Sequence, residues 1–299
     1  MINFKSITLA DKEWMDPIFK STTNHGAEYN FTSSYLWGGS CDMQVAFAHG
    51  CFTARRVCHG KTLYVWPVGG GDKEAVLREI VEETLEKGAP LHFYGPREAF
   101  GEELERMFAG KYEISEERQW FDYVYHIEKM ASLAGKKLHG KRNHINKFIE
   151  QNDWSVEEIT PANLPECEEM CEQWFKEAEQ NTEINYSIEK GILERVFSQY
   201  DAVGMEGALL RSSGRVIAFT MGELLSSDTY ITHFEKAYGN IQGAYPMINR
   251  EFSKIVMTRY PEVVYINRED DMGLENLRKA KLSYYPEMLV EKCTVTMKI

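Results

Sequence analysis

Residues 206–245 read EGALLRSSGRVIAFTMGELLSSDTYITHFEKAYGNIQGAY, and this stretch decides the fold. It contains three segments rich in apolar, β-branched and aromatic residues, at 206–211, 215–224 and 229–236. Short polar turns separate these segments, a pattern that predicts an antiparallel meander. A turn with glycine at 240–243 then leads into helical apolar spacing up to residue 259. The stretch therefore predicts three strands and a helix that packs on their sheet.

The segments on either side extend this order. The predicted strands and helices of the second half lie at 154–159, 164–179, 188–200, 206–211, 215–224, 229–236, 244–259, 263–267, 274–282 and 288–296, in the order βααβββαβαβ. The first half follows a shortened version of the same order and closes with a strand at 120–126. The predicted fold class is α/β, with two tandem domains that each contain a mixed, mostly antiparallel sheet flanked by helices. A doubly wound sheet would need alternating βα units from the start, which the meanders disfavour.

The length of 299 residues fits two domains. We expect a shortened N-terminal domain at 1–130, a basic inter-domain helix or linker at 131–153, and a C-terminal domain at 154–299. Hydrophobic residues make up 43% of the chain and charged residues 27%, as in globular proteins. No run approaches the roughly 18 apolar residues of a membrane span, and the first residues lack the apolar core of a secretory signal. We therefore expect a cytoplasmic protein with no integral membrane segment, of undetermined oligomeric state.

Positive charge is concentrated between the two halves, although the formal net charge is −12. The basic side chains of this window are Lys136, Lys137, Lys141, Arg142 and Lys147. The overall charge disfavours non-specific coating of nucleic acid, but these five residues are candidate contacts to nucleic-acid phosphates. The alternative is a solvated, charged linker helix.

The turn after the third strand of the meander is a candidate donor-binding site. Its candidate residues are Asn240, Gln242, Gly243, Ala244 and Tyr245. Unpaired N–H groups and the positive end of a helix dipole would meet there, an arrangement that suits a phosphate or pyrophosphate. The alternative is a plain helix start in which glycine makes a tight turn.

The strand before this turn carries the candidate general base. Alternation along 229–236 predicts that His233 and Glu235 project together from one face, near the donor turn. A base within hydrogen-bond reach can remove a proton from an attacking amine, and Glu235 is the preferred candidate. The alternative is that Glu235 faces solvent or pairs with Arg250.

Three stretches carry a family resemblance: LHGKRNHINKF at 138–148, HFEK at 233–236 and YINREDDMGLENLRKAKLSYYP at 265–286. They resemble the soluble bacterial family related to the C-terminal domain of phosphatidylglycerol lysyltransferase. The resemblance covers nearly the whole chain. It implies two tandem GNAT-like (acyl-CoA N-acyltransferase) domains, akin to the Fem-type aminoacyltransferases. The lysyltransferases and Fem enzymes take an aminoacyl group from charged tRNA.

The GNAT fold implies two further site features. In that superfamily the turn after the fourth strand holds the pyrophosphate of coenzyme A through a Gln/Arg-x-x-Gly-x-Gly/Ala pattern. Residues 240–245 lack the leading Gln/Arg and the final small residue. A tyrosine near the helix at 274–282 commonly protonates the departing group, so Tyr284 and Tyr285 are candidates for that role, with ordinary packing as the alternative.

The leading functional hypothesis is an acyl- or aminoacyltransferase. It would move its group from a phosphate-bearing donor, acyl-CoA or aminoacyl-tRNA, to an amine or hydroxyl acceptor, either a small molecule or lipid-like. We expect no metal and no tightly bound cofactor. The alternative is a non-catalytic protein that uses a degenerate GNAT fold to bind a ligand or tRNA.

Overall fold

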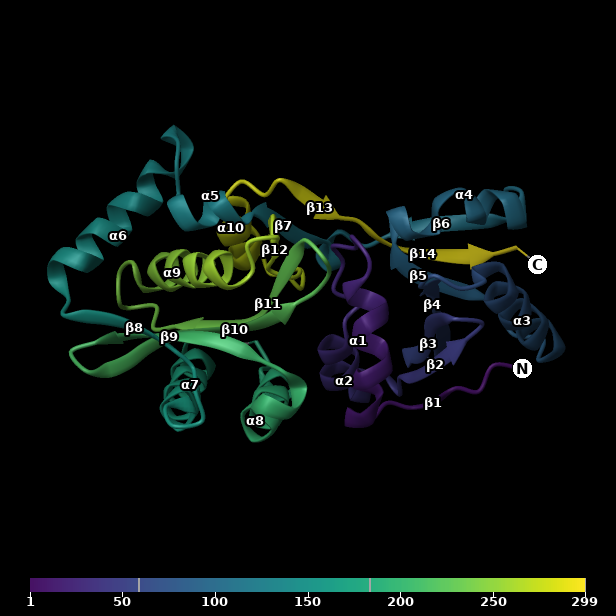
Figure 1. The fold of residues 1–299 in the computed structure, drawn as a ribbon, viewed down its shortest axis with the longest axis horizontal. Coiled ribbons are helices and arrows are strands. Elements are labelled where there is room, and N and C mark those ends of the chain that lie inside the picture. Colours follow the sequence, from purple (N-terminus) through teal and green to yellow (C-terminus); the bar gives the residue numbers. More distant parts are fainter. Residues whose placement is uncertain (59, 183, 299) are drawn as a thin grey trace.

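The computed structural model describes residues 1–58, 60–182 and 184–298, and this part of the chain forms two seven-stranded sheets (Figure 1). The first sheet has the order β1 (Lys5–Ser6), β2 (Gln44–Ala48), β3 (Cys51–Cys58), β4 (Lys61–Val68), β5 (His92–Pro96), β14 (Lys292–Met297) and β6 (Tyr112–Glu116). The second has the order β8 (Trp154–Glu158), β9 (Glu206–Ser212), β10 (Arg215–Leu224), β11 (Thr229–Ala237), β12 (Tyr265–Asn267), β7 (Asp122–His126) and β13 (Met288–Val290).

The two sheets share one pairing pattern. In each, four antiparallel strands are followed by one parallel pair, β4 with β5 and β11 with β12, and then by two more antiparallel strands. The predicted fold class, mixed and mostly antiparallel sheets flanked by helices, is confirmed.

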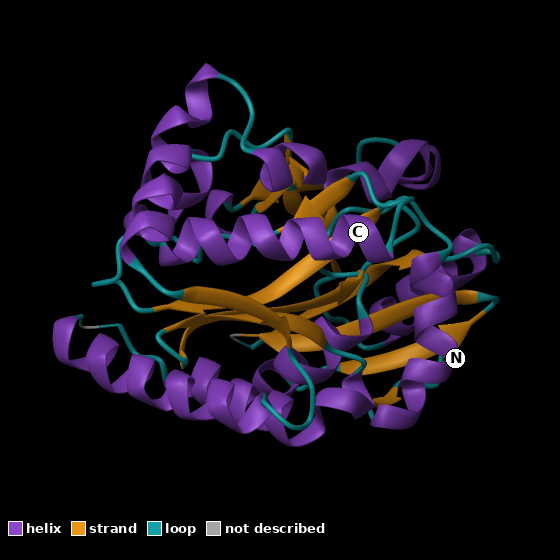
Figure 2. Ribbon diagram, turned by 60° about the vertical axis from the view of Figure 1, so that its left-hand side comes forward, coloured by secondary structure: helices purple, strands orange, loops and turns teal. Residues whose placement is uncertain are grey.

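Helices cover both faces of each sheet (Figure 2). They are α1 (Lys12–Lys20), α2 (Phe31–Trp37), α3 (Lys73–Glu86), α4 (Arg97–Phe108), α5 (Ile127–Ser132), α6 (His139–Gln151), α7 (Leu164–Asn181), α8 (Ser187–Val203), α9 (Ala244–Arg259) and α10 (Glu275–Leu282), with 3₁₀ turns at Leu9–Asp11, Gly38–Cys41, Arg118–Trp120 and Lys136–Leu138. In the second sheet α9 packs on one face, and α7 and α8 pack on the other.

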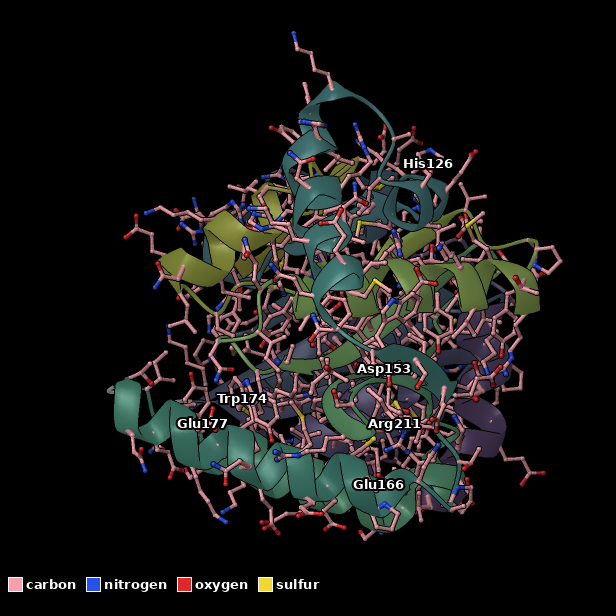
Figure 3. All side chains as sticks on the ribbon, turned by 90° about the vertical axis from the view of Figure 1, so that its left-hand side faces the viewer. His126, Asp153, Glu166, Trp174, Glu177 and Arg211 are labelled. Atoms are coloured by element: carbon pink, nitrogen blue, oxygen red, sulfur yellow. The ribbon has the colours of Figure 1, made fainter. Side chains whose placement is uncertain are left out.

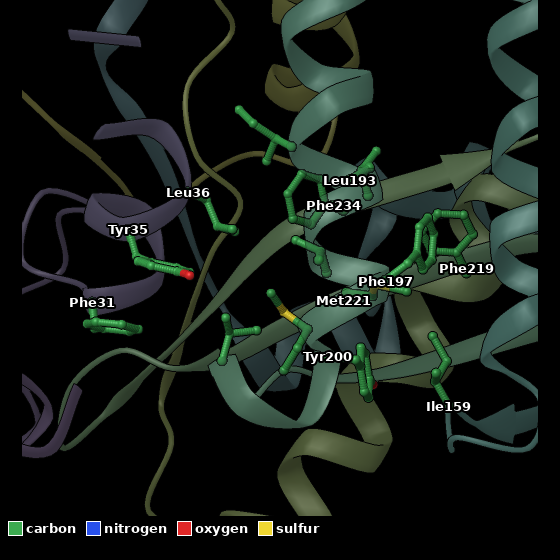
Figure 4. Packing of buried hydrophobic residues seen from close by; sticks show 14 of the residues in the cluster. Phe31, Tyr35, Leu36, Ile159, Leu193, Phe197, Tyr200, Phe219, Met221 and Phe234 are labelled. Atoms are coloured by element: carbon green, nitrogen blue, oxygen red, sulfur yellow. The ribbon is translucent and has the colours of Figure 1, made fainter. Parts of the chain in front are cut away.

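One hydrophobic core crosses from one half of the molecule to the other. Phe31 and Tyr35 of α2 belong to the same buried cluster as Phe197 of α8 and Phe219 of β10 (Figure 4). The ring of Phe31 stacks on Tyr35 at a centroid distance of 5.3 Å. Because this core is continuous, α1 and α2 fix the first sheet against the second.

The two halves exchange their last strands. β7 lies between β12 and β13 in the second sheet, and β14 lies between β5 and β6 in the first. The prediction that the strand at 120–126 closes the first sheet is therefore wrong, as is the single strand predicted at 288–296, which is two strands in different sheets. Apolar alternation predicts a strand but carries no information about which sheet receives it. The expected domain boundaries at 130 and 154 therefore separate the halves of the sequence but not the two sheets, because each sheet contains a strand from the other half of the chain.

A buried ion cluster lies where the exchanged strands begin. Lys292, the first residue of β14, places its Nζ 2.7 Å from Asp122, the first residue of β7, and 2.7 Å from Glu28. Tyr94 donates a 3.0 Å hydrogen bond to Glu28. Burial opposes the charge of Lys292, but the two carboxylates hold its pKa well above the usual value. The crossing point is therefore held by a charged lysine between two acids.

Candidate functional site

The candidate site lies where β11 and β12 diverge. Their parallel pairing ends at Ile231 and Asn267, while β11 continues to residue 237. Arg268 follows β12 directly and spans the gap, because its Nε and Nη2 bind both carboxylate oxygens of Glu235 at 2.6–3.1 Å. Arg268 is 8% exposed. A planar guanidinium that binds a carboxylate through two parallel bonds is a strong and oriented contact.

Aromatic rings and a lysine surround this pair. The Arg268 guanidinium lies 4.9 Å from the centre of the Tyr284 ring and 5.6 Å from that of Tyr125. Lys141 of α6 places its Nζ 4.1 Å from the Tyr284 ring, and burial together with the charge of Arg268 lowers its pKa. Asn249 of α9 faces the Tyr284 hydroxyl and lowers its pKa, without a hydrogen bond of normal geometry. We call these residues, Glu235, Asn249, Arg268, Tyr284 and Lys141, the Arg268 cluster.

Several polar atoms at the Arg268 cluster are buried and unpaired. In the described part of the chain, Arg268 Nη1 and both side-chain polar atoms of Asn249 have no hydrogen-bond partner. The hydroxyls of Thr220 and Thr232 are also buried and unpaired. Thr220 pairs with Glu235 across the sheet and therefore shares its face. Buried polar groups are rarely left without a hydrogen-bond partner, and the unpaired ones are commonly found at binding sites.

The loop after β12 is held by a second lysine. The Nζ of Lys281 donates to the backbone carbonyls of Arg268 (2.6 Å), Glu269 (3.2 Å) and Asp270. Asp271, at the end of the loop, accepts hydrogen bonds at 2.8 and 2.9 Å from Arg278. These contacts fix the backbone that presents Arg268, so Lys281 acts as a support for the site.

The structure does not bring His233 to Glu235. Phe234 pairs with Met221 and Thr232 with Gly222, so His233 is the extra residue of a β-bulge. Its ring nitrogens contact Glu269 at 2.8 Å and Glu223 at 3.2 Å, whereas Glu235 binds Arg268. The prediction that both side chains project together is wrong, because a bulge interrupts the alternation on which it depends.

The bulge also interrupts the predicted alternation of the residues that point to the opposite face of β11. Tyr230 packs with α9, whereas Phe234 belongs to the core beneath α7 and α8. Lys236 faces α7, with its Nζ 3.8 Å from the ring of Trp174 (labelled in Figure 3) and 2.8 Å from Glu189. Only Glu235 of the four-residue stretch at 233–236 therefore reaches the Arg268 cluster.

His233 predicts a pH dependence of stability. Burial opposes its protonation, but the contacts with Glu223 and Glu269 raise its pKa from 6.5 to about 9. A pKa raised in the folded state contributes stability that is complete below pH 6.5 and is lost as the pH rises through 9. We expect the free energy of unfolding to fall over this range by up to about 3 kcal/mol. Urea unfolding at pH 6, 8 and 9.5 measures it. His233→Gln should flatten the dependence of the unfolding free energy on pH. His139→Gln, at an exposed position, should leave that dependence unchanged. Equal pH dependence for wild type and His233→Gln would contradict this role of His233.

The predicted donor turn is covered by α6. Gly243 has φ +90°, and a Cβ atom there would lie 2.5 Å from the carbonyl oxygen of His144 and 2.8 Å from the Cβ of Phe148. Gln242 contacts the His144 ring at 3.0 Å. Pro246 in the first turn of α9 has no N–H to donate. Of the predicted donor residues, Gly243 and Ala244 are buried and Asn240 is exposed. Burial raises the pKa of Tyr245 to about 12, and the charge of Glu235 in the Arg268 cluster adds to the shift.

The five basic residues between the halves have three different environments. Lys136, Lys137 and Lys147 are exposed on α6 or the turn before it. Arg142 donates to the backbone carbonyls of residues 133 and 135. Lys141 belongs to the Arg268 cluster. Figure 1 shows α6 next to α9, on which it packs.

The two candidate tyrosines differ. Tyr284 is 4% exposed, and burial raises the pKa of its hydroxyl although the charge of Arg268 opposes the shift. Tyr285 is 40% exposed, and its backbone carbonyl accepts a 3.0 Å hydrogen bond from Lys129. Tyr284 therefore joins the cluster and Tyr285 does not. Sequence reasoning missed Asn249, Arg268 and Lys281 as site residues, although the last two stand in the most specific family stretch.

Two kinds of feature are absent from the described residues. These residues contain no group of three or more His, Cys, Asp or Glu side chains arranged to hold a metal ion. Within the same residues, no helix has the length and apolar character needed to cross a membrane.

The chain is similar to known proteins along most of its length. The family model described as "Phosphatidylglycerol lysyltransferase, C-terminal" matches residues 19–296. A conserved protein of unknown function from Bacteroides thetaiotaomicron is 33% identical, with a TM-score of 0.93 and all of both chains covered. L-PGS from Bacillus licheniformis is 14% identical, with a TM-score of 0.67 over 96% of this chain and 92% of that one. This likeness concerns the fold, two mixed sheets flanked by helices.

One curated relative is also similar. An uncharacterised protein from Mycoplasmoides gallisepticum is 24% identical over 178 residues, which is 58% of this chain. The match spans 55% of the length of that relative.

Proposed function

The chain belongs to the family of the phosphatidylglycerol lysyltransferase C-terminal domain, and from this premise we propose that it transfers an aminoacyl group from aminoacyl-tRNA to an amine or hydroxyl acceptor. The observation that carries the proposal is the Arg268 cluster, in which a fixed guanidinium and unpaired donors stand beside a tyrosine. A preorganised set of donors in a water-poor site can stabilise charge that develops on an ester carbonyl. The reaction needs positioning and charge stabilisation, which these residues can supply.

The arrangement of α6 supports tRNA as the donor. Lys147 of α6, and Lys136 and Lys137 of the 3₁₀ turn before it, present positive charge to solvent, while Lys141 of α6 reaches the cluster. Phosphates on the outer side of α6 would therefore bring an attached aminoacyl group near the buried side. The turn at Gly243, which was predicted to hold the phosphate of either donor and matches the coenzyme A pattern only in part, is closely approached by the backbone of α6. This favours aminoacyl-tRNA over acyl-CoA.

Reversing the exposed charge of α6 should weaken tRNA binding. For the triple variant Lys136→Glu, Lys137→Glu, Lys147→Glu we expect affinity for charged tRNA to fall by at least roughly tenfold, with a shallower dependence on salt, because fewer phosphate counterions are released. Filter binding at several salt concentrations measures both quantities.

The matched control reverses exposed lysines elsewhere. Lys176→Glu with Lys190→Glu, on α7 and α8, lowers the net charge in the same direction and should leave the affinity within twofold of wild type. Equal loss in both variants would mean that net charge alone attracts tRNA. Wild-type protein that binds no tRNA would overturn the proposed donor.

The alternative of a non-catalytic binding protein has one observation in its favour. Both oxygens of Glu235 accept from Arg268, so the residue expected to act as general base is already engaged. Tight binding of charged tRNA without transfer to any acceptor in a panel of amines, alcohols and phosphatidylglycerol vesicles would support this alternative.

A further inference from the structure

We infer that Asn249 and Nη1 of Arg268 together bind the carbonyl oxygen of the transferred aminoacyl ester, which makes Asn249 a catalytic residue. This inference rests on the proposed aminoacyl transfer and goes beyond it by naming the group that touches the reacting atom. Nothing in the periodicity of α9 marks Asn249, since it occupies a core position of an amphipathic helix. Its assignment comes from the chemistry of its surroundings.

Asn249 lowers the pKa of the Tyr284 hydroxyl that it faces, but its side chain makes no hydrogen bond of normal geometry to the described residues. The side chain is 5% exposed, yet neither its amide nitrogen nor its carbonyl oxygen has a hydrogen-bond partner in the part of the chain that the structure describes. On the same helix, one turn later, Ser253 is fully buried and does satisfy its hydroxyl, on the backbone carbonyl of Asn249 at 2.7 Å. An unpaired buried amide costs stability, so a purely structural role does not explain an asparagine here.

The unpaired donors of Asn249 and Arg268 both lie near the Tyr284 ring. Arg268 stands 4.9 Å from the centre of the Tyr284 ring, and Asn249 also lies beside Tyr284. Nη1 is the one guanidinium nitrogen of Arg268 that Glu235 does not bind. Glu235 therefore fixes the plane of the guanidinium and leaves both N–H bonds of Nη1 without a partner among the described residues.

The charges around the Tyr284 ring favour an oxyanion. Lys141 and Arg268 bring positive charge to the Tyr284 ring, and within the cluster only Glu235 carries a carboxylate. A neutral carbonyl that becomes an oxyanion gains more from such surroundings than it does in its ground state. The Asn249 oxygen, the remaining unpaired acceptor, suits the α-amino group that every aminoacyl ester carries next to its carbonyl.

The reaction balances with these groups. The amine or hydroxyl of the acceptor attacks the ester carbon, and the π pair of the carbonyl moves to its oxygen, which Asn249 and Arg268 hold. Collapse restores the carbonyl and breaks the bond to the ribose oxygen of the tRNA. The proton lost by the nucleophile ends on that ribose oxygen, so the products are aminoacylated acceptor and free tRNA.

The test replaces Asn249 by leucine, which keeps most of the volume and removes both polar atoms. We expect kcat for transfer from aminoacyl-tRNA to fall by about 10²–10³-fold, the usual effect of losing one oxyanion donor, with KM changed less than threefold. Because the amide makes no hydrogen bond of normal geometry within the described part of the chain, the Tm of Asn249→Leu should stay close to that of wild type. Thr258→Ala, at the exposed end of the same helix, is the control and should leave kcat and Tm unchanged.

A second probe separates this inference from the proposed function. (1-Aminoethyl)phosphonate carries a tetrahedral anion in place of the carbonyl, and calorimetry should show that wild type binds it at least tenfold more tightly than Asn249→Leu or Asn249→Asp does. If wild type is active and Asn249→Leu keeps the full wild-type kcat, the role of Asn249 is overturned while the proposed function stands. A lower Tm with full kcat would assign the residue to packing, whereas wild type with no transfer and no phosphonate binding would remove the proposed function as well.

Discussion

Replacing Lys292 by methionine should lower the free energy of unfolding by about 3–5 kcal/mol, because the substitution leaves two buried carboxylates without their cation. Lys292 is 6% exposed and lies 2.7 Å from both Asp122 and Glu28. These residues stand where β7 and β14 cross between the sheets, so the loss should act on both halves together. Urea unfolding followed by intrinsic fluorescence should give one transition with a lower midpoint.

The control for this experiment lies in the same segment of chain. Lys298 is exposed and pairs with Glu113 at 2.9 Å, so Lys298→Met should change stability by less than about 0.5 kcal/mol. If Lys292→Met cost under 1 kcal/mol, the cluster would not hold the exchanged strands. If it unfolded in two separate transitions, the halves would not be interlocked as a unit.

Replacing Arg268 by methionine should reduce aminoacyl transfer by about 10³-fold, since it removes the donor at the carbonyl and also leaves Glu235 without its partner. Arg268→Lys separates charge from geometry. Lysine keeps the positive charge but lacks the planar fork that binds both oxygens of Glu235, so we expect it to recover at most a small part of the rate. Single-turnover rates with saturating enzyme measure the effect on the chemical step.

Arg259→Lys provides the comparison for Arg268. Arg259 is an arginine of α9 whose side chain is 38% exposed and pairs with Glu158 and Glu206. We expect its substitution by lysine to leave the transfer rate within twofold. An Arg268→Lys variant as active as Arg259→Lys would mean that the bidentate contact with Glu235 has no part in the reaction.

Much of the second half could be predicted from the sequence because its elements are long and periodic. The helix at 244–259 and the strand at 215–224 have the bounds that apolar spacing predicts. α2 was missed because its polar residues Thr32 and Ser34 are buried and do not mark an exposed face, although Asn30 caps the helix by accepting from the N–H of Ser33 at 2.7 Å. The exchange of β7 and β14 could not be predicted, because pairing partners far apart in sequence leave no local pattern.

The site was predicted in part for the same reason. Glu235 and Tyr284 were named from strand and helix positions, and both lie in the Arg268 cluster. The bulge moved His233 away, since one extra residue reverses the direction of a side chain that alternation predicts. Asn249 becomes visible only when the partners of each buried polar atom are known, and these depend on the packing of α9 over the sheet.

One measurement tests the proposed transfer most directly. Wild type, Arg268→Met and the triple variant of α6 are each mixed with tRNA charged with a labelled amino acid and with the acceptor panel, and single-turnover movement of label is followed beside a parallel reaction with labelled acetyl-CoA. We predict that wild type moves label from tRNA to an acceptor, that both variants fail to do so at comparable concentration, and that acetyl-CoA is not used. Consumption of acetyl-CoA with no transfer from tRNA, or equal transfer by wild type and Arg268→Met, would contradict the proposed aminoacyl transfer.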